Sequence, residues 1–239
     1  MISEKNYKNY ISLGYFCSVA MELERIGLRS ASYPFDWLVT PEFSHVLEMI
    51  ETGFSGFLDK DRLSLKQGTS KIYVNSATGF SFVHDFDDKR SLSEQLASVD
   101  DKFRRRIDRF YRDIEKPTMF IRYISDETYL PDGRSEDIGW IEDNYAHILD
   151  VIRSYNSEND IIWIANSSLS SEIIPDLYTV EKDENDTVAR RPLDKNTELC
   201  KLLTEVYYPE REVNLDIYMH KQRKKKGIIN RIFNRFTGN

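Results

Sequence analysis

The chain has 239 residues, of which 40% are hydrophobic and 31% are charged. This balance excludes wholesale disorder, and the length is sufficient for a substantial hydrophobic core. No apolar stretch approaches the roughly 20 residues that span a bilayer, and the N-terminus lacks the apolar core of a signal peptide. Only two cysteines are present, Cys17 and Cys200, which excludes a disulfide framework. We therefore expect a cytoplasmic protein with reduced thiols.

Charge divides the chain into two parts. The net charge is −7, yet residues 221–239 hold seven Lys/Arg and no acidic residue. The acidic remainder argues against nucleic-acid binding, which needs a basic surface. We predict one α/β catalytic-type domain over residues 1–220 and a basic amphipathic tail over 221–239.

The tail has an apolar face if it is helical. That face combines Ile228, Ile229, Ile232, Phe233 and Phe236. A basic block followed by such a face predicts docking on an anionic membrane surface or on a partner protein. Docking on the membrane would make the protein peripheral at the inner face. A solvated tail, or a helix packed on the body, remains the alternative.

The first half of the chain mixes short strands and helices. Residues 9–14 predict a strand, and apolar spacing over 16–28 predicts a helix that Gly27 ends. Pro34 between aromatic residues predicts a rigid loop over 30–40. A helix over 41–50 and two short strands, 72–75 and 80–84, follow.

The second half alternates more regularly. The predicted elements are a helix with apolar positions from Leu92 to Ile114 that Pro117 ends, a strand over 118–125, a helix over 138–155, a strand over 160–166, a long loop over 172–194, a helix over 197–207 and a last strand or docking segment over 213–218. Alternating strands and helices are typical of a parallel sheet with helical crossovers. We predict a three-layer Rossmann-like fold of the SGNH or flavodoxin type, with a mostly parallel sheet flanked by helices.

Cys17 lies where the first strand ends and the first helix begins. Backbone N–H groups and the dipole at a helix N-terminus favour an anion, hence a thiolate, and could hold an oxyanion. The alternative is a packed, inert thiol, because cysteine is among the most buried residue types.

His84 is the predicted proton acceptor for Cys17. Ligands bind beyond the carboxyl ends of the strands in a parallel sheet, and His84 ends the strand over 80–84. A carboxylate would orient the imidazole, with Asp36, Asp85 and Asp87 as candidates and Asp36 favoured because Pro34 makes its loop rigid. A histidine at a strand end that is merely hydrogen-bonded is the alternative.

Other polar side chains follow the predicted strands. Arg122 and Asp126 are expected at or past the end of the strand over 118–125, and Asn166 closes the strand over 160–166. We expect Arg122 to bind a carboxylate or phosphate and Asn166 to assist the oxyanion. A structural ion pair is an equal alternative for Arg122. The predicted substrate-binding set is Gly14, Ser18, Trp37, Arg122 and Asn166. No spacing of ligands predicts a metal site.

Several motifs together resemble a known family. They are Ser12-Leu13-Gly14-Tyr15-Phe16-Cys17-Ser18, Leu28-Arg29, Pro34-Phe35-Asp36-Trp37-Leu38, Phe82-Val83-His84-Asp85-Phe86 and Met119-Phe120-Ile121-Arg122. Over residues 9–165 the chain resembles uncharacterised proteins described as papain-like cysteine peptidases, which occur with surface-polysaccharide and glycosyltransferase systems. The resemblance implies Cys17 as nucleophile and His84 as base.

The layout differs from that of papain. Papain-type enzymes carry a Cys-Gly-Ser/Ala-Cys-Trp/Tyr motif with the histidine more than a hundred residues downstream, whereas His84 follows Cys17 by 67 residues. The alternation of elements is more similar to SGNH-hydrolase-like capsule-biosynthesis proteins, with the nucleophile after the first strand. That similarity implies ester hydrolysis, or acyl transfer from a carrier such as coenzyme A.

We therefore expect a Cys-His acyl-transfer enzyme acting in surface-polysaccharide or glycan biosynthesis, on a glycan, acyl-ester or peptide substrate. It would be a peptidase, an esterase or an acyltransferase, without a required cofactor and with coenzyme A as a candidate acyl donor. The tail over 221–239 would meet the membrane or a glycosyltransferase partner. The alternative is a non-catalytic module that binds a nucleotide-sugar or coenzyme A and is recruited to a membrane glycan-assembly complex.

Overall fold

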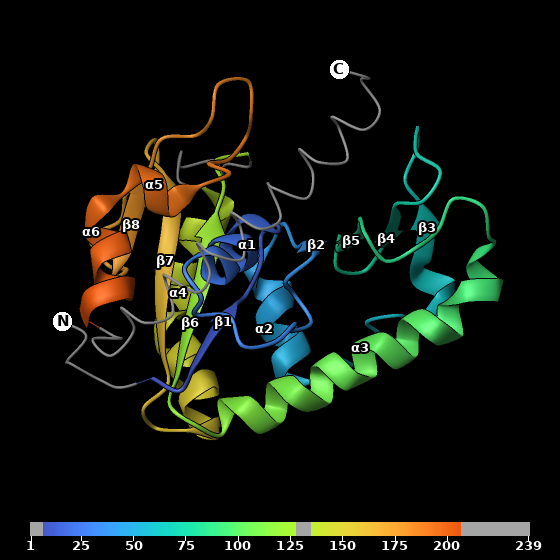
Figure 1. Ribbon diagram of the computed structural model, residues 1–239, viewed down its shortest axis with the longest axis horizontal. Helices are drawn as coiled ribbons and strands as arrows, with labels where there is room; N and C mark the ends of the chain where they lie inside the picture. Colours follow the sequence, from blue (N-terminus) through green and yellow to red (C-terminus); the bar gives the residue numbers. More distant parts are fainter. Residues whose placement is uncertain (1–6, 128–134, 207–239) are drawn as a thin grey trace, which may run out of the picture.

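The structure is a computed structural model of the chain, and it describes residues 7–127 and 135–206. The predicted segment 213–218 and the predicted tail over 221–239 lie outside the described residues. A four-stranded parallel sheet forms the centre, in the order β1-β6-β7-β8 (Figure 1). Its strands are β1 (Asn9–Ser12), β6 (Thr118–Ile124), β7 (Asp160–Asn166) and β8 (Leu177–Val180).

The two central strands, β6 and β7, carry apolar residues on both faces. Every residue of β6 and β7 is buried, as in sheets that helices cover on both sides. Because successive side chains point to opposite faces, Met119 and Ile121 enter one core whereas Phe120 and Ile124 enter the other.

Helices cover both faces of this sheet. One face packs against α1 (Ser18–Arg25), α5 (Pro192–Lys195) and α6 (Thr197–Lys201), and a π-helical turn, Leu202–Val206, continues α6. The other face packs against α2 (Phe43–Glu51), α3 (Leu92–Ile114) and α4 (Glu136–Tyr155). The prediction of an α/β fold with a parallel sheet flanked by helices is confirmed.

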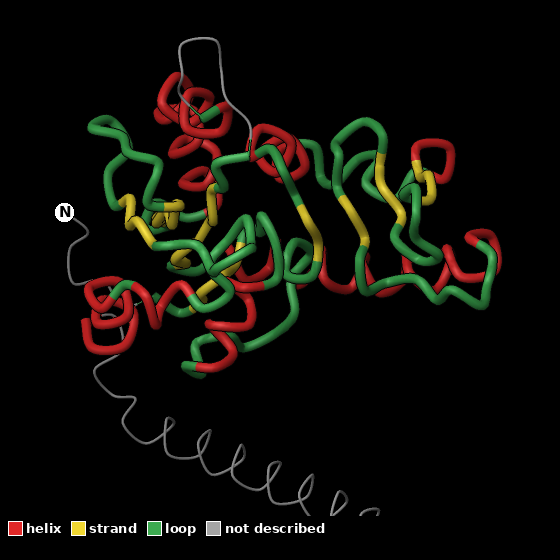
Figure 2. The backbone as a smooth tube through the Cα atoms, turned by 90° about the horizontal axis from the view of Figure 1, so that it is seen from above, coloured by secondary structure: helices red, strands yellow, loops and turns green. Residues whose placement is uncertain are grey.

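A second, antiparallel sheet was not predicted as a unit, although two of its strands lie within the predicted strands 72–75 and 80–84. Its order is β2-β5-β4-β3, with β2 (Leu38–Val39), β5 (Ser81–Phe82), β4 (Tyr73–Asn75) and β3 (Leu63–Leu65), and a 3-10 turn, Lys60–Arg62, precedes β3. These strands lie to one side of the parallel sheet (Figure 2).

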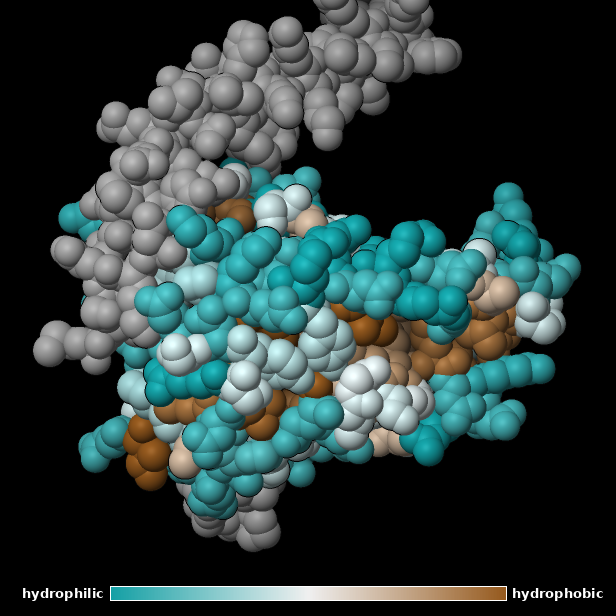
Figure 3. Space-filling model, turned by 90° about the horizontal axis from the view of Figure 1, so that it is seen from below, coloured by the Kyte–Doolittle hydropathy of each residue, from teal (hydrophilic) through white to brown (hydrophobic). Residues whose placement is uncertain are grey.

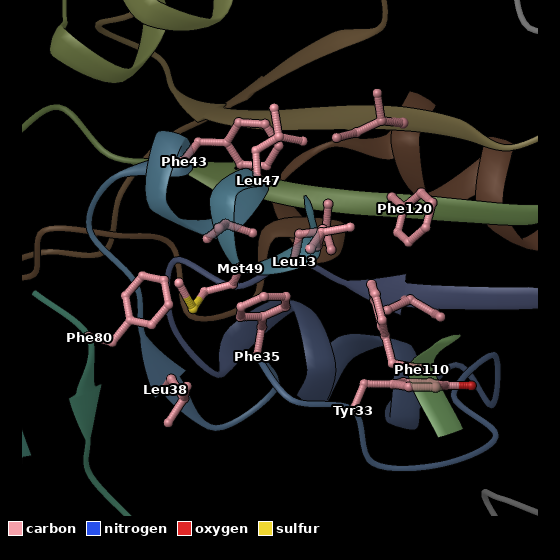
Figure 4. Close-up of a cluster of buried hydrophobic side chains, with 14 of the residues drawn as sticks. Leu13, Tyr33, Phe35, Leu38, Phe43, Leu47, Met49, Phe80, Phe110 and Phe120 are labelled. Atoms are coloured by element: carbon pink, nitrogen blue, oxygen red, sulfur yellow. The ribbon is translucent and has the colours of Figure 1, made fainter. Parts of the chain in front are cut away.

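One aromatic core joins the two sheets. Phe35 lies 5.2 Å from Phe54, 6.2 Å from Phe80 and 6.3 Å from Phe110 between ring centroids. Figure 4 shows Phe35, Phe80 and Phe110 in this core, with Phe120 of β6 above Phe110. Because the cores are continuous, β2 and β5 are fixed relative to β1.

The predicted boundaries of helices and strands agree best with the structure where a hydrophobic pattern extends over many residues. The strand over 160–166 is confirmed to the residue, and the apolar positions from Leu92 to Ile114 lie in one helix, α3, as predicted. The loop predicted over 172–194 is wrong in part, because it contains β8 and α5. Strand β8 is a short edge strand with one fully buried residue, Val180, so it lacks the apolar run of a central strand.

Within residues 7–127 and 135–206 no helix is both long and apolar enough to cross a membrane. Apolar side chains gather between hydrophilic margins on the face seen in Figure 3. A cavity of about 500 Å³ lies between the segment 53–59 and α3, with Phe54, Phe57 and Phe103 in its lining.

Candidate active site

The turn between β1 and α1 has an unusual backbone. Gly14 and Tyr15 are consecutive residues with positive φ, +82° and +54°. A Cβ atom on Gly14 would lie 2.5 Å from Thr40 Oγ1, so no larger residue fits without movement. Tyr15 N–H donates to Thr40 Oγ1 (3.1 Å), and Thr40 N–H donates to Tyr15 O (2.8 Å). Backbone strain of this kind is concentrated at functional sites.

Cys17 stands at the end of that turn, beyond the carboxyl end of β1. It is the N-cap residue of α1, it is half-buried, and its carbonyl accepts the Met21 N–H at 3.0 Å. Burial raises the pKa of the Cys17 thiol, against the lowering effects of its own backbone N–H and of Arg190. The first N–H groups of α1 have no intrahelical partner, so they remain able to bind an anion.

Ser18 follows Cys17 and is 1% exposed. Its hydroxyl has no hydrogen-bond partner among the described residues. A buried hydroxyl without a partner is uncommon and costs free energy. Contact of Ser18 with a substrate stays a prediction.

His84 lies two residues past the end of β5, a strand of the second sheet. The argument that strand ends bring His84 to the same sheet edge as Cys17 is wrong, because β5 is antiparallel to β2 and does not belong to the parallel sheet. Val39 pairs with Ser81, and Thr40 lies next to Tyr15. The chain therefore leaves Ser81 in the direction away from the β1–α1 turn as it approaches His84.

Among the described residues, no carboxylate binds the His84 ring. The ring is exposed and makes an edge contact with Trp37, with 6.4 Å between centroids. Among the described residues it forms no hydrogen bond or ion pair. Trp37 also stacks under the guanidinium of Arg29 at 5.1 Å. A role of His84 as the base for Cys17 stays a prediction that now lacks its topological argument.

Asp36 is 1% exposed, and its hydrogen bonds stabilise the loop that contains it. Its carboxylate accepts the Tyr33 N–H (2.9 Å) and both Nη2 (2.8 Å) and Nε (3.0 Å) of Arg29. Burial raises the pKa of Asp36, and the Arg29 charge opposes that rise. These contacts explain the rigidity predicted for the loop, but the carboxylate accepts no hydrogen bond from His84.

Arg122 is fully buried between the turn and α4. Its guanidinium donates to Thr40 Oγ1 (2.7 Å), Thr40 O (2.8 Å), Pro41 O (3.2 Å), Leu13 O (3.2 Å) and Asp137 Oδ2 (3.1 Å). Burial lowers the pKa of Arg122, against the effect of Asp137. Of the two roles predicted for Arg122, this geometry is that of the structural ion pair, and it fixes the turn that carries Cys17.

Asn166 is also fully buried, at the end of β7. Its oxygen accepts the Tyr123 hydroxyl (2.5 Å), and its Nδ2 donates to Asp126 Oδ1 (2.7 Å) and Thr187 O (2.8 Å). With both amide hydrogens engaged, Asn166 organises the loops at this edge of the sheet. Its predicted role at an oxyanion would require these bonds to break.

The sequence analysis missed two residues near Cys17, Tyr123 and Arg190. The rings of Tyr15 and Phe16 lie 6.2 Å and 5.6 Å from that of Tyr123. The Tyr123 hydroxyl accepts the Ala189 N–H at 2.9 Å, which brings the following residue, Arg190, to the site. Tyr15 hydrogen-bonds Glu127. The sequence did not single out Tyr123 as a site residue because it lies in a uniformly buried strand. It did not single out Arg190 because that residue lies in the loop predicted over 172–194.

A half-exposed thiol at a helix N-terminus, after a strained strand–helix turn, defines a candidate cysteine-nucleophile site. Residues 8–138, more than half of the chain, match the family model described as "Putative papain-like cysteine peptidase (DUF1796)". The chain belongs to this family. The matched residues include Cys17, Asp36, His84 and Arg122 but not Asn166 or Arg190.

One curated relative is a viral protein. The chain is 27% identical over 184 residues to "Uncharacterized protein R408" of Acanthamoeba polyphaga mimivirus, which covers 68% of this chain and 79% of the relative. No solved structure matches the chain.

Proposed function

We propose that the protein is a cysteine hydrolase that cleaves an acyl bond with Cys17 as its nucleophile. The observation that carries this proposal is the position of Cys17: half-exposed, at the N-terminus of α1, on a turn that Thr40 and Arg122 hold in place. Membership of a family described as cysteine peptidases supports the same chemistry.

In this reaction Cys17 Sγ attacks the acyl carbonyl, and the bond to the leaving amine or alcohol breaks. The thiol proton passes through a base to the leaving group. Water then attacks the thioester, which releases the acid and restores the thiol. Free N–H groups at the start of α1 would stabilise the oxyanion.

We propose His84 as the base, on the resemblance of its motif to that of the family. Because no contact joins His84 to Cys17, this role requires the segment 83–86 to approach the β1–α1 turn when substrate binds. In this proposal Asp36 does not orient the imidazole directly. It stabilises the loop that carries Trp37, and Trp37 contacts His84.

A direct test compares wild type with four variants on p-nitrophenyl esters, thioesters and a peptide library. Cys17→Ala should abolish hydrolysis, and Cys17→Ser should reduce it at least 100-fold, on the order of what loss of a nucleophile costs. The matched control is Cys200→Ser, with unchanged rates. Full activity of Cys17→Ala would refute the proposal. His84→Asn tests the base separately.

A more specific part of the proposal concerns the acceptor of the acyl group and the biological substrate. A glycan hydroxyl could take the acyl group instead of water, with coenzyme A as donor, in surface-polysaccharide biosynthesis. Support comes from the resemblance to the family and to SGNH-hydrolase-like capsule proteins. Adding sugar acceptors to an acyl-coenzyme A assay separates transfer from hydrolysis by product mass.

One observation favours a second candidate, a non-catalytic binding module. None of the three histidines in the described part of the chain contacts Cys17: His45 pairs with Glu42, His147 pairs with Glu51, and His84 touches Trp37. The raised pKa of Cys17 points the same way. Such a module would bind a nucleotide-sugar or coenzyme A tightly, with the same affinity in Cys17→Ala, and would hydrolyse nothing.

A further inference from the structure

One face of α3 carries a row of charged side chains. Lys102, Arg106, Arg109 and Asp113 follow one another at intervals of three or four residues, so they lie along one side of the helix. Helix α3 extends from the parallel sheet to the second sheet (Figure 1). All four side chains belong to half-buried residues, which distinguishes this face from an ordinary solvated one. Other parts of the chain therefore pack against it.

The loop before β2 packs against the Arg109 end of this face. Arg109 Nη1 donates to Ser32 O at 2.7 Å, and the Ser32 hydroxyl accepts a hydrogen bond from Arg29 Nη2, also at 2.7 Å. Arg29 is neutralised by Asp36 at 2.8 Å. Ser32 thus brings two guanidinium groups together, and only that of Arg29 has a close carboxylate partner.

The segment after β5 packs against the Lys102 end of the same face. Lys102 Nζ donates to Asp85 Oδ1 at 2.6 Å, and the Asp85 side chain is 2% exposed. Arg106 Nη1 lies 3.8 Å from the same oxygen, which is too far for a hydrogen bond. Lys102 is therefore the main counterion of Asp85, and Arg106 is only distantly paired.

Arg106 is left without a hydrogen bond. Its side chain is 14% exposed, and its guanidinium carbon lies 5.0 Å from the centroid of the Phe103 ring. The buried Nη1 has no partner, and no other nitrogen of this guanidinium binds an acceptor among the described residues. A guanidinium has five N–H donors, and leaving buried donors unsatisfied costs free energy. Such a group calls for an explanation.

The neighbouring charges do not supply the missing acceptors. Arg109 has one acceptor, the uncharged Ser32 carbonyl, and no carboxylate partner in the described part of the chain. Burial lowers the pKa of Arg106; Asp85 and Asp36 oppose that effect, and the charges of Arg29 and Arg109 add to it. Arg106 and Arg109, three residues apart on one helix face, thus present two positive charges with unused donors.

We propose that Arg106 and Arg109 form a binding site for the phosphate group of a small molecule. Their two charges match those of a phosphate monoester near neutral pH, and the guanidinium fork fits its oxygens. Because Arg29 stacks on Trp37, and Trp37 contacts His84, the site adjoins the segment that carries His84. The inference goes beyond the proposed function, since neither arginine takes part in the reaction at Cys17.

The test measures thermal unfolding of the full chain in sodium phosphate, against sodium chloride of equal ionic strength. At ten times the dissociation constant of phosphate, the midpoint of wild type should rise by about 3–6 °C. Arg106→Met should bind phosphate at least tenfold more weakly, as expected for losing a hydrogen bond to a charged group. Its shift at the same concentration should then be less than about a third of that of wild type.

Three further variants make the result specific. Arg109→Lys keeps the charge without the fork, so its affinity should be intermediate. The matched control is Arg105→Met, because Arg105 lies on α3, is exposed and forms no hydrogen bond or ion pair with a described residue; it should bind phosphate as wild type does. Cys17→Ala should also bind normally, so failure of the proposed hydrolase activity remains distinguishable from failure of this site.

Stability without phosphate separates ligand binding from a structural role of Arg106. Arg106→Met should be at least as stable as wild type, because it removes a largely buried cation that lacks acceptors. A lower midpoint of Arg106→Met with an undiminished phosphate shift would show a structural residue and overturn the inference. No phosphate shift in wild type, or an equal shift in Arg105→Met and Arg106→Met, would do the same. An equal shift with acetate would overturn the assignment to phosphate.

Discussion

Replacing Arg122 with methionine separates a structural from a substrate-binding role. Arg122 is 0% exposed and donates five hydrogen bonds, to Leu13, Thr40, Pro41 and Asp137. Removing one partner of a buried ion pair typically costs about 3–5 kcal/mol, because the other charge is left uncompensated. Asp137 still accepts the Phe43 N–H at 2.7 Å, so we expect a loss near the lower limit, about 3 kcal/mol.

Urea unfolding followed by tryptophan fluorescence measures this loss, since Trp163 is fully buried. A loss of about 3 kcal/mol is a large fraction of the roughly 5–15 kcal/mol that stabilises a domain. Arg122→Met combined with Asp137→Asn should be less destabilised than the sum of the single variants, because no buried charge remains alone.

Two results would refute this reasoning about Arg122. The first is an unfolding midpoint of Arg122→Met equal to that of wild type. The second is a normal midpoint together with an increased KM for a hydrolysed ester, which is the signature of a substrate-binding residue.

The remaining predictions concern the turn, the edge of the sheet and the tail. Gly14→Ala should lose about 2–4 kcal/mol in the urea assay, because alanine disfavours positive φ and its Cβ would clash with Thr40; an unchanged midpoint would contradict the strained turn. Asp126 is partly buried, which raises its pKa, but hydrogen bonds from Ser168, Lys182 and Asn166 outweigh that effect and lower its pKa. Asp126→Asn should therefore be about 1 kcal/mol less stable at pH 7, and the difference should shrink as pH falls below about 4 and disappear below the lowered pKa; a difference that persists at low pH would contradict the assigned charge. Deleting 221–239 should abolish co-sedimentation with anionic vesicles and leave the unfolding midpoint unchanged; equal binding by both chains would contradict membrane docking by the tail.

The fold was predictable where one pattern extends over many residues. The apolar stripe of α3 and the apolar run of β7 determine those elements locally, so the sequence predicts both where the structure has them. Strands β3 and β8 are short and half-exposed, and their place depends on pairing with distant residues. Pairing over such distances leaves little trace in local periodicity.

The candidate site was predictable in part for the same reason. The strand–turn–helix arrangement around Cys17 is local, and the glycine, the thiol and the helix start are all visible in the sequence. The place of His84 depends on which sheet β5 joins, and the place of Arg190 depends on the Tyr123–Ala189 hydrogen bond. Neither follows from spacing along the chain. The sequence could not decide between ligand binding and a structural ion pair for Arg122, because a buried arginine and a ligand-binding arginine look alike in sequence.

The central claim is that the Cys17 sulfur forms an acyl bond with substrate. Mass spectrometry of the intact Cys200→Ser protein, quenched in acid within seconds of mixing with p-nitrophenyl acetate, tests it most directly. We predict a single acetyl group that peptide mapping locates on Cys17 and that is lost on further incubation at neutral pH as water regenerates the thiol. Absence of the adduct, or acetyl groups spread over lysine side chains with Cys17 unmodified, would contradict the claim.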